Sequence, residues 1–238
     1  MGSDLSSIVI GIDEAGRGPL LGDLVIGFIA LDENQLKVLG ELGVRDSKEL
    51  SPKQREILVK QINRFSLLSM TSYVSTYSID RHKLNRIISN RIILLFKIFN
   101  NLYKGYINKD ALIKIYIDEI KGYREYIYTN VYTLFSNSVK EFVMEKNADK
   151  KYLVVSAASI LAKYTRDQNL GKAKIIFGEF GSGYPSDPKT REWISEKYKI
   201  YKDPPPIIRR SWTTLLSIAP SWYRNLKKGL SILDFINR

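Results

Sequence analysis

The sequence contains no cysteine and only one histidine, His82, in 238 residues. Without cysteine there is no disulfide bond, no thiolate zinc site and no cysteine nucleophile. A Ser-His-Asp triad would have to use His82, which lies between Arg81 and Lys83 and is expected to be solvated or to cap a helix. Any metal site in this chain must therefore consist of oxygen ligands.

Long hydrophobic runs are also missing. The longest apolar stretches, such as residues 25–31 and 92–96, are far too short to cross a bilayer as a helix. No basic segment followed by an apolar leader precedes the first strand-like run, so the sequence predicts a cytoplasmic protein without a membrane partner.

Acidic residues are outnumbered by basic ones. The chain has 37 Lys and Arg against 25 Asp and Glu, which gives a formal net charge of +12. The surplus favours a polyanionic partner, with nucleic acid before a membrane surface. About half of the surplus lies in residues 181–238, which hold 11 basic and 5 acidic side chains.

The apolar patterning predicts an α/β domain with a mixed sheet over residues 1–180, because three early strands are followed by alternating strands and helices. Ser51, Pro52 and Gln54 have the pattern of a helix start with a capping box. The expected strands are 8–12, 24–31, 67–75, 112–117 and 141–144, and the expected helices are 52–65, 79–99 (the longest of the chain), 125–136 and 156–170.

The basic C-terminal part, residues 181–238, is predicted to be a small helical appendage packed on that domain. Prolines at 204–206 interrupt its helical pattern, so short helices joined by turns are expected.

Two adjacent carboxylates, Asp13 and Glu14, stand where the first buried strand ends, before a Gly-Arg-Gly turn. Charges at such a place cost free energy unless they are paired, hydrogen-bonded or neutralised by a metal. They could equally begin a solvated turn, and this stretch alone does not separate the two interpretations.

Two further carboxylates favour a metal site. Asp118 ends another buried strand, and it would share an edge with Asp13 if the two strands were parallel neighbours. A hydrogen bond to a backbone amide is the alternative for Asp118. Asp167 lies on the apolar face of the helix predicted at 156–170, where Arg17 or Arg166 could neutralise it structurally, or a divalent metal functionally.

Four oxygen-ligand carboxylates suit Mg²⁺ or Mn²⁺. On a strongly basic protein they suggest cleavage of a phosphodiester bond with the help of two metal ions.

Five motifs then follow one another along the chain: residues 13–18 (Asp-Glu-Ala-Gly-Arg-Gly), 45–51 (with Asp-Ser-Lys), 155–163, 181–188 and 208–212. Together they resemble type 2 ribonuclease H (ribonuclease HII), in particular its archaeal and eukaryotic branch. The resemblance implies a ribonuclease H-like fold with a mixed five-stranded sheet flanked by helices. It also implies hydrolysis of RNA in RNA–DNA hybrids and on the 5′ side of ribonucleotides embedded in duplex DNA, leaving 5′-phosphate and 3′-hydroxyl ends.

The same resemblance implies the site residues. The metal ligands would be Asp13, Glu14, Asp118 and Asp167, with Glu119 as a rival to Asp118. Gly16, Arg17 and Gly18 would sense the ribose 2′-hydroxyl, Tyr184 would pack on the following deoxyribose, and Lys48 and Lys163 would contact phosphates. An ordinary tight turn and a surface aromatic are the alternatives for the glycine turn and for Tyr184, and solvated surface charges for the two lysines.

Arg209 and Arg210 could contact the duplex backbone or pair with acids. Trp193 and Trp212 are expected to pack the appendage rather than to stack on bases.

Three rival interpretations remain at the level of sequence. The chain could be another ribonuclease H-like nuclease of the junction-resolvase or ribonuclease HIII type, or a basic nucleic-acid-binding protein whose carboxylates only pair with arginines.

Residues 229–236 loosely resemble a sliding-clamp-binding peptide, with Ile232, Phe235 and Ile236 at the apolar positions and Gly229 in place of the usual glutamine. A terminal helix docked on its own domain is the alternative for this tail, and a monomer is expected.

Overall fold

The computed structural model describes residues 5–44, 50–103 and 107–225. These residues form two compact units. The sheet unit contains the chain up to Arg17, Leu24–Val74 and Asn85–Gln168, and the C-terminal unit contains Gly18–Asp23, Ser75–Leu84 and the chain from Asn169 onward. The division at residue 181 stays a prediction.

A five-stranded sheet in the order β3-β2-β1-β4-β5 forms the centre of the sheet unit. Its strands are β1 (Leu5–Ala15), β2 (Leu24–Asp32), β3 (Leu68–Val74), β4 (Ile107–Asp118) and β5 (Val139–Glu145). The first three strands are antiparallel neighbours, whereas β1 and β4 pair in parallel, as do β4 and β5. The carboxyl ends of β1, β4 and β5 therefore lie at one edge, which meets the condition under which Asp13 and Asp118 would share an edge.

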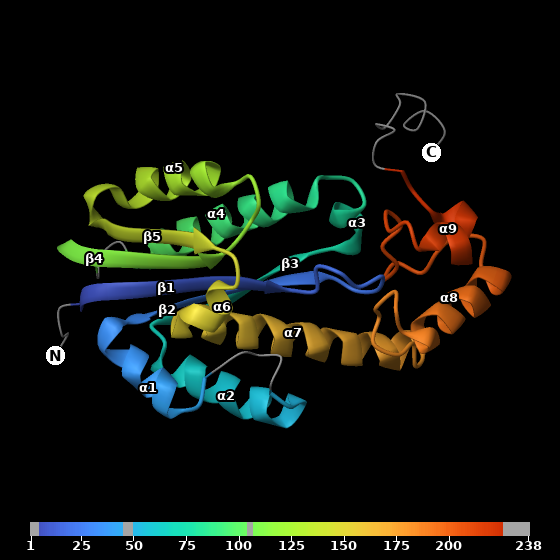
Figure 1. The fold of residues 1–238 in the computed structure, drawn as a ribbon, viewed down its shortest axis with the longest axis horizontal. Coiled ribbons are helices and arrows are strands. Elements are labelled where there is room, and N and C mark those ends of the chain that lie inside the picture. The colour runs from blue at the N-terminus through green and yellow to red at the C-terminus, as the bar shows by residue number, and fades with distance from the viewer. Residues whose placement is uncertain (1–4, 45–49, 104–106, 226–238) are drawn as a thin grey trace. The chain divides into compact units, whose positions relative to one another are not determined.

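Helices cover both faces of this sheet, with α4 and α5 on one face and α1, α2 and α7 on the other (Figure 1). The bounds are α1 (Leu36–Glu41), α2 (Pro52–Phe65), α4 (Leu84–Tyr103), α5 (Arg124–Phe135), α6 (Ala148–Lys151) and α7 (Leu153–Phe177), with 3-10 turns η1 (Glu33–Gln35) and η3 (Ser136–Ser138). The α4 face is filled by packed rings of Phe28, Phe96, Phe99 and Phe135.

The capping box at the start of α2 is confirmed, because the Ser51 hydroxyl accepts from the Gln54 amide and the Gln54 side chain accepts from the Ser51 amide. The prediction of one longest helix at 79–99 is wrong in two ways. The chain forms a short α3 (Thr76–Ile79) and then α4, and α7, with 25 residues, is longer than both. The break follows from Asp80, whose carboxylate is held by the amides of Arg210 and Ser211, each at 2.8 Å.

Helix α7 lies unusually close to the sheet because glycines stand beneath it. A methyl group on Gly11 would overlap the carbonyl oxygen of Val154, and one on Gly27 would overlap that of Ala158. Gly27 is the cross-strand partner of Asp13. This close approach therefore sets the distance between α7 and the Asp13 end of β1.

Gly27→Ala is expected to lower the free energy of unfolding by about 1–3 kcal/mol, because the new methyl group meets fixed backbone atoms. Urea unfolding measures the change. Gly171→Ala is the control, since Gly171 lies in α7, the helix that Gly27 approaches, and a methyl group there meets nothing within 4 Å. The control is expected to be neutral or stabilising by up to about 1 kcal/mol, and equal losses in both variants would contradict the close-approach argument.

The C-terminal unit contains α3, α8 (Pro188–Ile200), α9 (Leu215–Ile218) and the turn η4 (Pro220–Trp222) around its own apolar core. Trp193 and Trp222 are buried in this core and Trp212 packs against it, as expected for Trp193 and Trp212. Arg209 is fully buried, with its Nε donating to the Gly22 carbonyl at 2.8 Å. Such an arginine stabilises the unit and is not available to a duplex backbone.

No helix in the described part of the chain is long and apolar enough to span a membrane.

Candidate active site

Asp13 occupies the end of β1 under α7, and it is 6% exposed. Its Oδ1 accepts a hydrogen bond from the Glu14 amide at 2.7 Å, and the Ser159 side chain of α7 also bonds to its carboxylate. Burial is the main reason that the pKa of Asp13 lies well above its ordinary value, and the negative charges of Glu14 and Asp118 raise it further. A carboxylate in such surroundings is stabilised by a cation.

Glu14, the next residue of β1, has a side chain that is 8% exposed and bonded to Arg17, with Nε to Oε1 at 2.7 Å. Burial raises the pKa of Glu14, the guanidinium of Arg17 opposes this shift, and Asp118 and Asp149 add to it. Arg17 is itself held by Asn85, whose Oδ1 accepts from Nη1 at 2.6 Å. The ion pair with Arg17 therefore neutralises the charge of the Glu14 carboxylate in this structure.

Asp118 ends β4, and its Oδ1 accepts a hydrogen bond from the Ala148 amide at 3.0 Å. This bond fixes the start of α6, whose first turn carries Asp149. Asp149 is 7% exposed and its charge acts on Glu14. The neighbouring Glu119 is exposed. The geometry thus favours Asp118 over Glu119 and adds a carboxylate, Asp149, that the sequence analysis missed.

The chemistry of this donor set fits Mg²⁺ or Mn²⁺, because buried carboxylate oxygens that repel one another are the ligands such hard cations select. Among the described residues, no three acidic or histidine side chains are placed so that they could hold a metal ion together. The Glu14 carboxylate is paired with Arg17, a cation of the chain itself.

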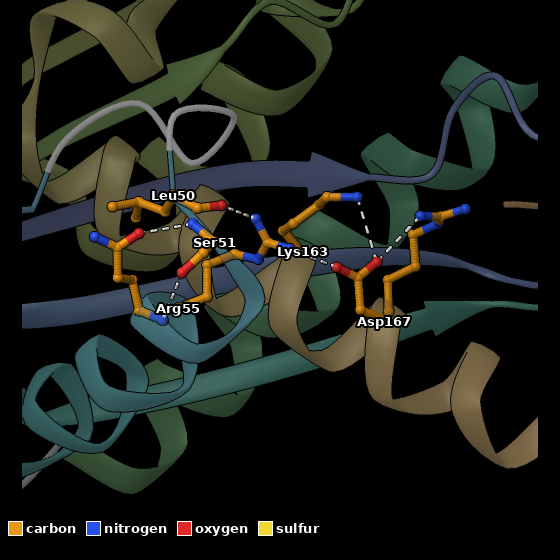
Figure 2. Close-up of polar contacts among 7 residues, drawn as sticks. Leu50, Ser51, Arg55, Lys163 and Asp167 are labelled. Atoms are coloured by element: carbon orange, nitrogen blue, oxygen red, sulfur yellow. Dashed lines mark hydrogen bonds and ion pairs between the residues drawn. The ribbon is translucent and has the colours of Figure 1, made fainter.

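Asp167, on α7, is surrounded by cations (Figure 2). Its carboxylate lies 3.0 Å from Arg55 Nη2 and 3.3 Å from both Lys163 Nζ and Arg166 Nη1. Arg55 and Arg166 are buried, whereas Asp167 has a side chain that is 33% exposed. Arg166 was one of the two counter-charges that the sequence suggested for Asp167.

Arg55 also donates to the Leu50 carbonyl at 2.5 Å, so it ties the start of α2 to α7 (Figure 2). Lys163, a predicted phosphate contact, extends from the same α7 turn with a side chain that is 28% exposed. Lys48, the other predicted phosphate contact, lies outside the described residues.

The predicted sugar-contacting residues fall at the start of the Gly-Arg-Gly turn and in the C-terminal unit. Gly16 has φ of +94°, a left-handed conformation that favours glycine. Within the C-terminal unit, a methyl group on Gly18 would lie 3.7 Å from Cε1 of Tyr184, and Tyr184 is 37% exposed. Trp212 donates its indole N–H to the Gly18 carbonyl at 3.0 Å. The structure thus brings Gly18 and Tyr184 together from distant parts of the sequence.

Two hydrogen bonds donated by backbone amides hold Tyr184 in this place. The Gly183 carbonyl accepts from the Leu20 amide at 2.7 Å. The Asp187 carboxylate accepts from the Ser182 amide at 2.6 Å, and this bond is the main reason that its pKa is lowered to about 2. The turn that carries Tyr184 is therefore fixed at both sides.

Sequence reasoning missed Asn85, Asp149 and Ser159, and it assigned Trp212 only a packing role and not its bond to the Gly18 carbonyl. Asp149 could have been found, because it follows the predicted strand at 141–144 as Asp118 follows its own strand. The other three make contacts that depend on packing between distant segments and leave no local signal.

Comparison with known proteins gives consistent results. A family model described as Ribonuclease HII matches residues 10–215 of this chain. Ribonuclease HII of Pyrococcus horikoshii is 40% identical over 221 residues, which cover 91% of this chain and 95% of the relative. Ribonuclease HII of Sulfurisphaera tokodaii is 40% identical over 220 residues, which cover 91% and 98% of the two chains.

Solved structures of ribonuclease HII proteins also resemble this chain. The crystal structure of ribonuclease H2 from Pyrococcus horikoshii superposes with a TM-score of 0.76 at 38% identity, over 92% of this chain and all of that chain (100%). Ribonuclease HII of Archaeoglobus fulgidus, solved in complex with PCNA, gives a TM-score of 0.70 at 31% identity, over 87% and 95% of the chains. The predicted fold, a mixed five-stranded sheet flanked by helices, is confirmed.

Proposed function

Because the chain belongs to the ribonuclease HII family, an endoribonuclease family that acts on RNA–DNA hybrids, we propose that the strand-end carboxylates are its catalytic centre. One observation carries this proposal: Glu14 is buried at the end of β1, its burial raises its pKa, and the charges of Asp118 on β4 and Asp149 on α6 raise that pKa further. Acids gathered in this way in a basic enzyme of phosphodiester cleavage are placed to hold cations.

Asp13, Glu14 and Asp118 are the proposed ligands, supported by the sequence motif and by their place at the ends of neighbouring parallel strands, and a divalent metal is the cofactor class that the family indicates. For the fourth place, the sequence motif suggests Asp167, whereas the electrostatic effect of Asp149 on Glu14 supports Asp149. Two bound Mg²⁺ or Mn²⁺ ions would lower the pKa of an attacking water and neutralise charge on the leaving oxygen. Ser159 holds the orientation of the Asp13 carboxylate, and Arg17 balances Glu14.

Selectivity for RNA is proposed to reside in Gly16, Arg17, Gly18 and Tyr184. The backbone at the glycines can approach a ribose closely, and the 2′-hydroxyl is the group that separates RNA from DNA. Tyr184 lies so near Gly18 that a methyl group there would touch its ring, which supports a shared role for these two residues. Lys163 and Lys48 are proposed to contact phosphates, which position the duplex without reading its sequence. The proposed products carry 5′-phosphate and 3′-hydroxyl ends.

Cleavage of a duplex DNA with one embedded ribonucleotide tests the proposed selectivity. In Mg²⁺ or Mn²⁺, the strand is expected to be nicked on the 5′ side of the ribonucleotide, while an all-DNA duplex of the same sequence stays intact. Denaturing gel electrophoresis with end-labelled strands measures both the position and the product ends. Equal cutting of the two duplexes would exclude the role of the glycine turn in sensing the 2′-hydroxyl.

The tail, residues 229–236, lies outside the described residues. Its resemblance to a clamp-binding peptide, together with the PCNA complex of the Archaeoglobus fulgidus relative, supports the proposal that a sliding clamp is a second partner.

A further inference from the structure

The C-terminal unit contains a groove of about 290 Å³ between the end of α7, α8 and the segment that follows α8. Its walls include the large apolar side chains of Ile176, Phe177, Trp193, Tyr201 and Pro204. Trp193 forms a fixed floor, since it is 5% exposed and its Nε1 donates to the Phe177 carbonyl at 3.1 Å. The groove is thus built from ordered elements and does not depend on a mobile side chain for its base.

The rim of the groove leaves apolar surface in water. Ile176 is 74% exposed and Tyr201 is 50% exposed, and their sequence neighbours Ile175 and Ile200 are 86% and 70% exposed. Single exposed apolar residues are normal, but a cluster beside a groove is typical of a surface that another segment covers.

The described chain ends beside this groove. Trp222 stacks edge-on against Tyr198 with ring centroids 5.1 Å apart, and it donates to the Lys202 carbonyl at 2.9 Å. Tyr198 and Lys202 are the immediate sequence neighbours of Lys197, Tyr201 and Asp203, which line the groove. The described residues stop at Asn225, three positions after Trp222.

The thirteen residues from 226 to 238 have the length and the chemistry to fill the groove. Six of them are Leu, Ile or Phe. Extended, thirteen residues reach about 43 Å, and as a helix about 20 Å. The groove has one charge of each sign, Lys197 and Asp203, and the segment offers partners for both, Asp234 for the lysine and Lys227 or Lys228 for the aspartate.

We propose that the C-terminal segment, residues 226–238, docks its apolar side chains in this groove of its own chain. Docking removes the segment's leucine, isoleucine and phenylalanine side chains from water and covers the exposed isoleucines of α7 and α8. The same segment carries the proposed clamp-binding residues, so a free clamp-binding tail would require undocking. The docking itself depends neither on the clamp nor on the proposed catalytic centre.

The cysteine-free sequence allows a direct test in the full-length chain. Ile176→Cys is combined with a cysteine at Leu230, Leu233 or Ile236, and disulfide formation is followed by non-reducing electrophoresis and peptide mass spectrometry. At least one pair is expected to give an intramolecular disulfide in most of the protein. The matched control replaces Ile176→Cys by Leu216→Cys, because Leu216 is 53% exposed on α9 outside the groove. Equal yields from both sites, or disulfides only between molecules, would overturn the proposal.

A second measurement needs no new bond. Docking protects Lys227 and Lys228 from trypsin. Ile176→Asp is expected to speed cleavage there by about tenfold, because losing the burial of one isoleucine shifts the equilibrium between docked and undocked segment by about that factor. Leu216→Asp is the control and is expected to leave the rate unchanged. The same cleavage rate in wild type and Ile176→Asp would overturn the proposal.

Discussion

Asp13→Asn is expected to lower the rate of hybrid cleavage by about 1000-fold or more, while affinity for the hybrid changes little. Asp13 is buried at the end of β1, and Glu14, Ser159 and Asp118 all act on its carboxylate. Loss of a metal ligand removes several kcal/mol of transition-state stabilisation, and each 1.36 kcal/mol corresponds to a factor of ten in rate. Single-turnover cleavage and binding in Ca²⁺ measure the two quantities separately.

The stability of the same variant provides its control. In metal-free protein the raised pKa of Asp13 means that the native state keeps a proton that the unfolded state has lost. Unfolding then releases a proton, so the Asp13 contribution to stability falls as the pH rises from about 3.9, the ordinary value, through the raised native value. Asparagine has no proton to lose, so it removes the free-energy cost of ionising the buried Asp13 carboxyl. Across that interval the unfolding free energy of Asp13→Asn minus that of wild type is expected to increase with pH.

A variant that is inactive and also unfolded at neutral pH would contradict this account, because the substitution would then have removed a structural contact. Retained cleavage in a folded variant would exclude Asp13 as a metal ligand. Lost rate, retained binding and improved stability together would show that the Asp13 charge is needed for catalysis although it destabilises the folded protein.

Local sequence signals predicted much of the fold. Strand-like apolar runs located all five strands, and the Ser51 capping box placed the start of α2 at Pro52. The parallel pairing of β1 and β4, which brings Asp13 and Asp118 to one edge, was stated as a condition and is confirmed. These features depend on neighbours in sequence or on general rules of α/β sheets.

Features that depend on distant segments were not predicted. Gly11 and Gly27 are ordinary strand residues in sequence, and only the position of α7 shows why they lack side chains. The break between α3 and α4 depends on amides of Arg210 and Ser211, about 130 positions away in the chain. Apolar periodicity contains no information about such contacts.

The same limit applies to the fourth carboxylate. Asp167 was chosen because a charge on the apolar stripe of a helix requires a counter-charge, and the structure supplies Arg55, Lys163 and Arg166. Asp149 lies only four residues beyond β5, and its position next to Glu14 depends on the bond between Asp118 and the start of α6. The position of a carboxylate on the apolar face of a helix indicates that it needs a counter-charge, but not whether that counter-charge is a basic side chain or a metal ion.

Asp149→Asn and Asp167→Asn are expected to have opposite effects. Asp149→Asn should lower cleavage by about 1000-fold or more, as expected for a ligand, and should weaken Mn²⁺ binding in a titration. Its stability should be unchanged or improved, because the negative charge that acts on Glu14 is removed.

Asp167→Asn should retain cleavage within about tenfold, since its carboxylate orders Lys163 and two buried arginines. It should lose about 1.5–3 kcal/mol of unfolding free energy, the worth of hydrogen bonds between charged groups.

Rate, Mn²⁺ affinity and urea stability measured on the two variants therefore decide the fourth ligand. Asparagine keeps the size of each side chain, so a shared loss of fold is not expected from packing. If Asp167→Asn abolishes cleavage and Mn²⁺ binding in a stable protein while Asp149→Asn remains active, Asp167 is the ligand that the sequence motif predicted. In that case the cations around it in Figure 2 would have to release its carboxylate when metal binds. The opposite outcome assigns the metal to the carboxyl ends of three neighbouring parallel strands, with Arg55, Lys163 and Arg166 left as the electrostatic support of α7.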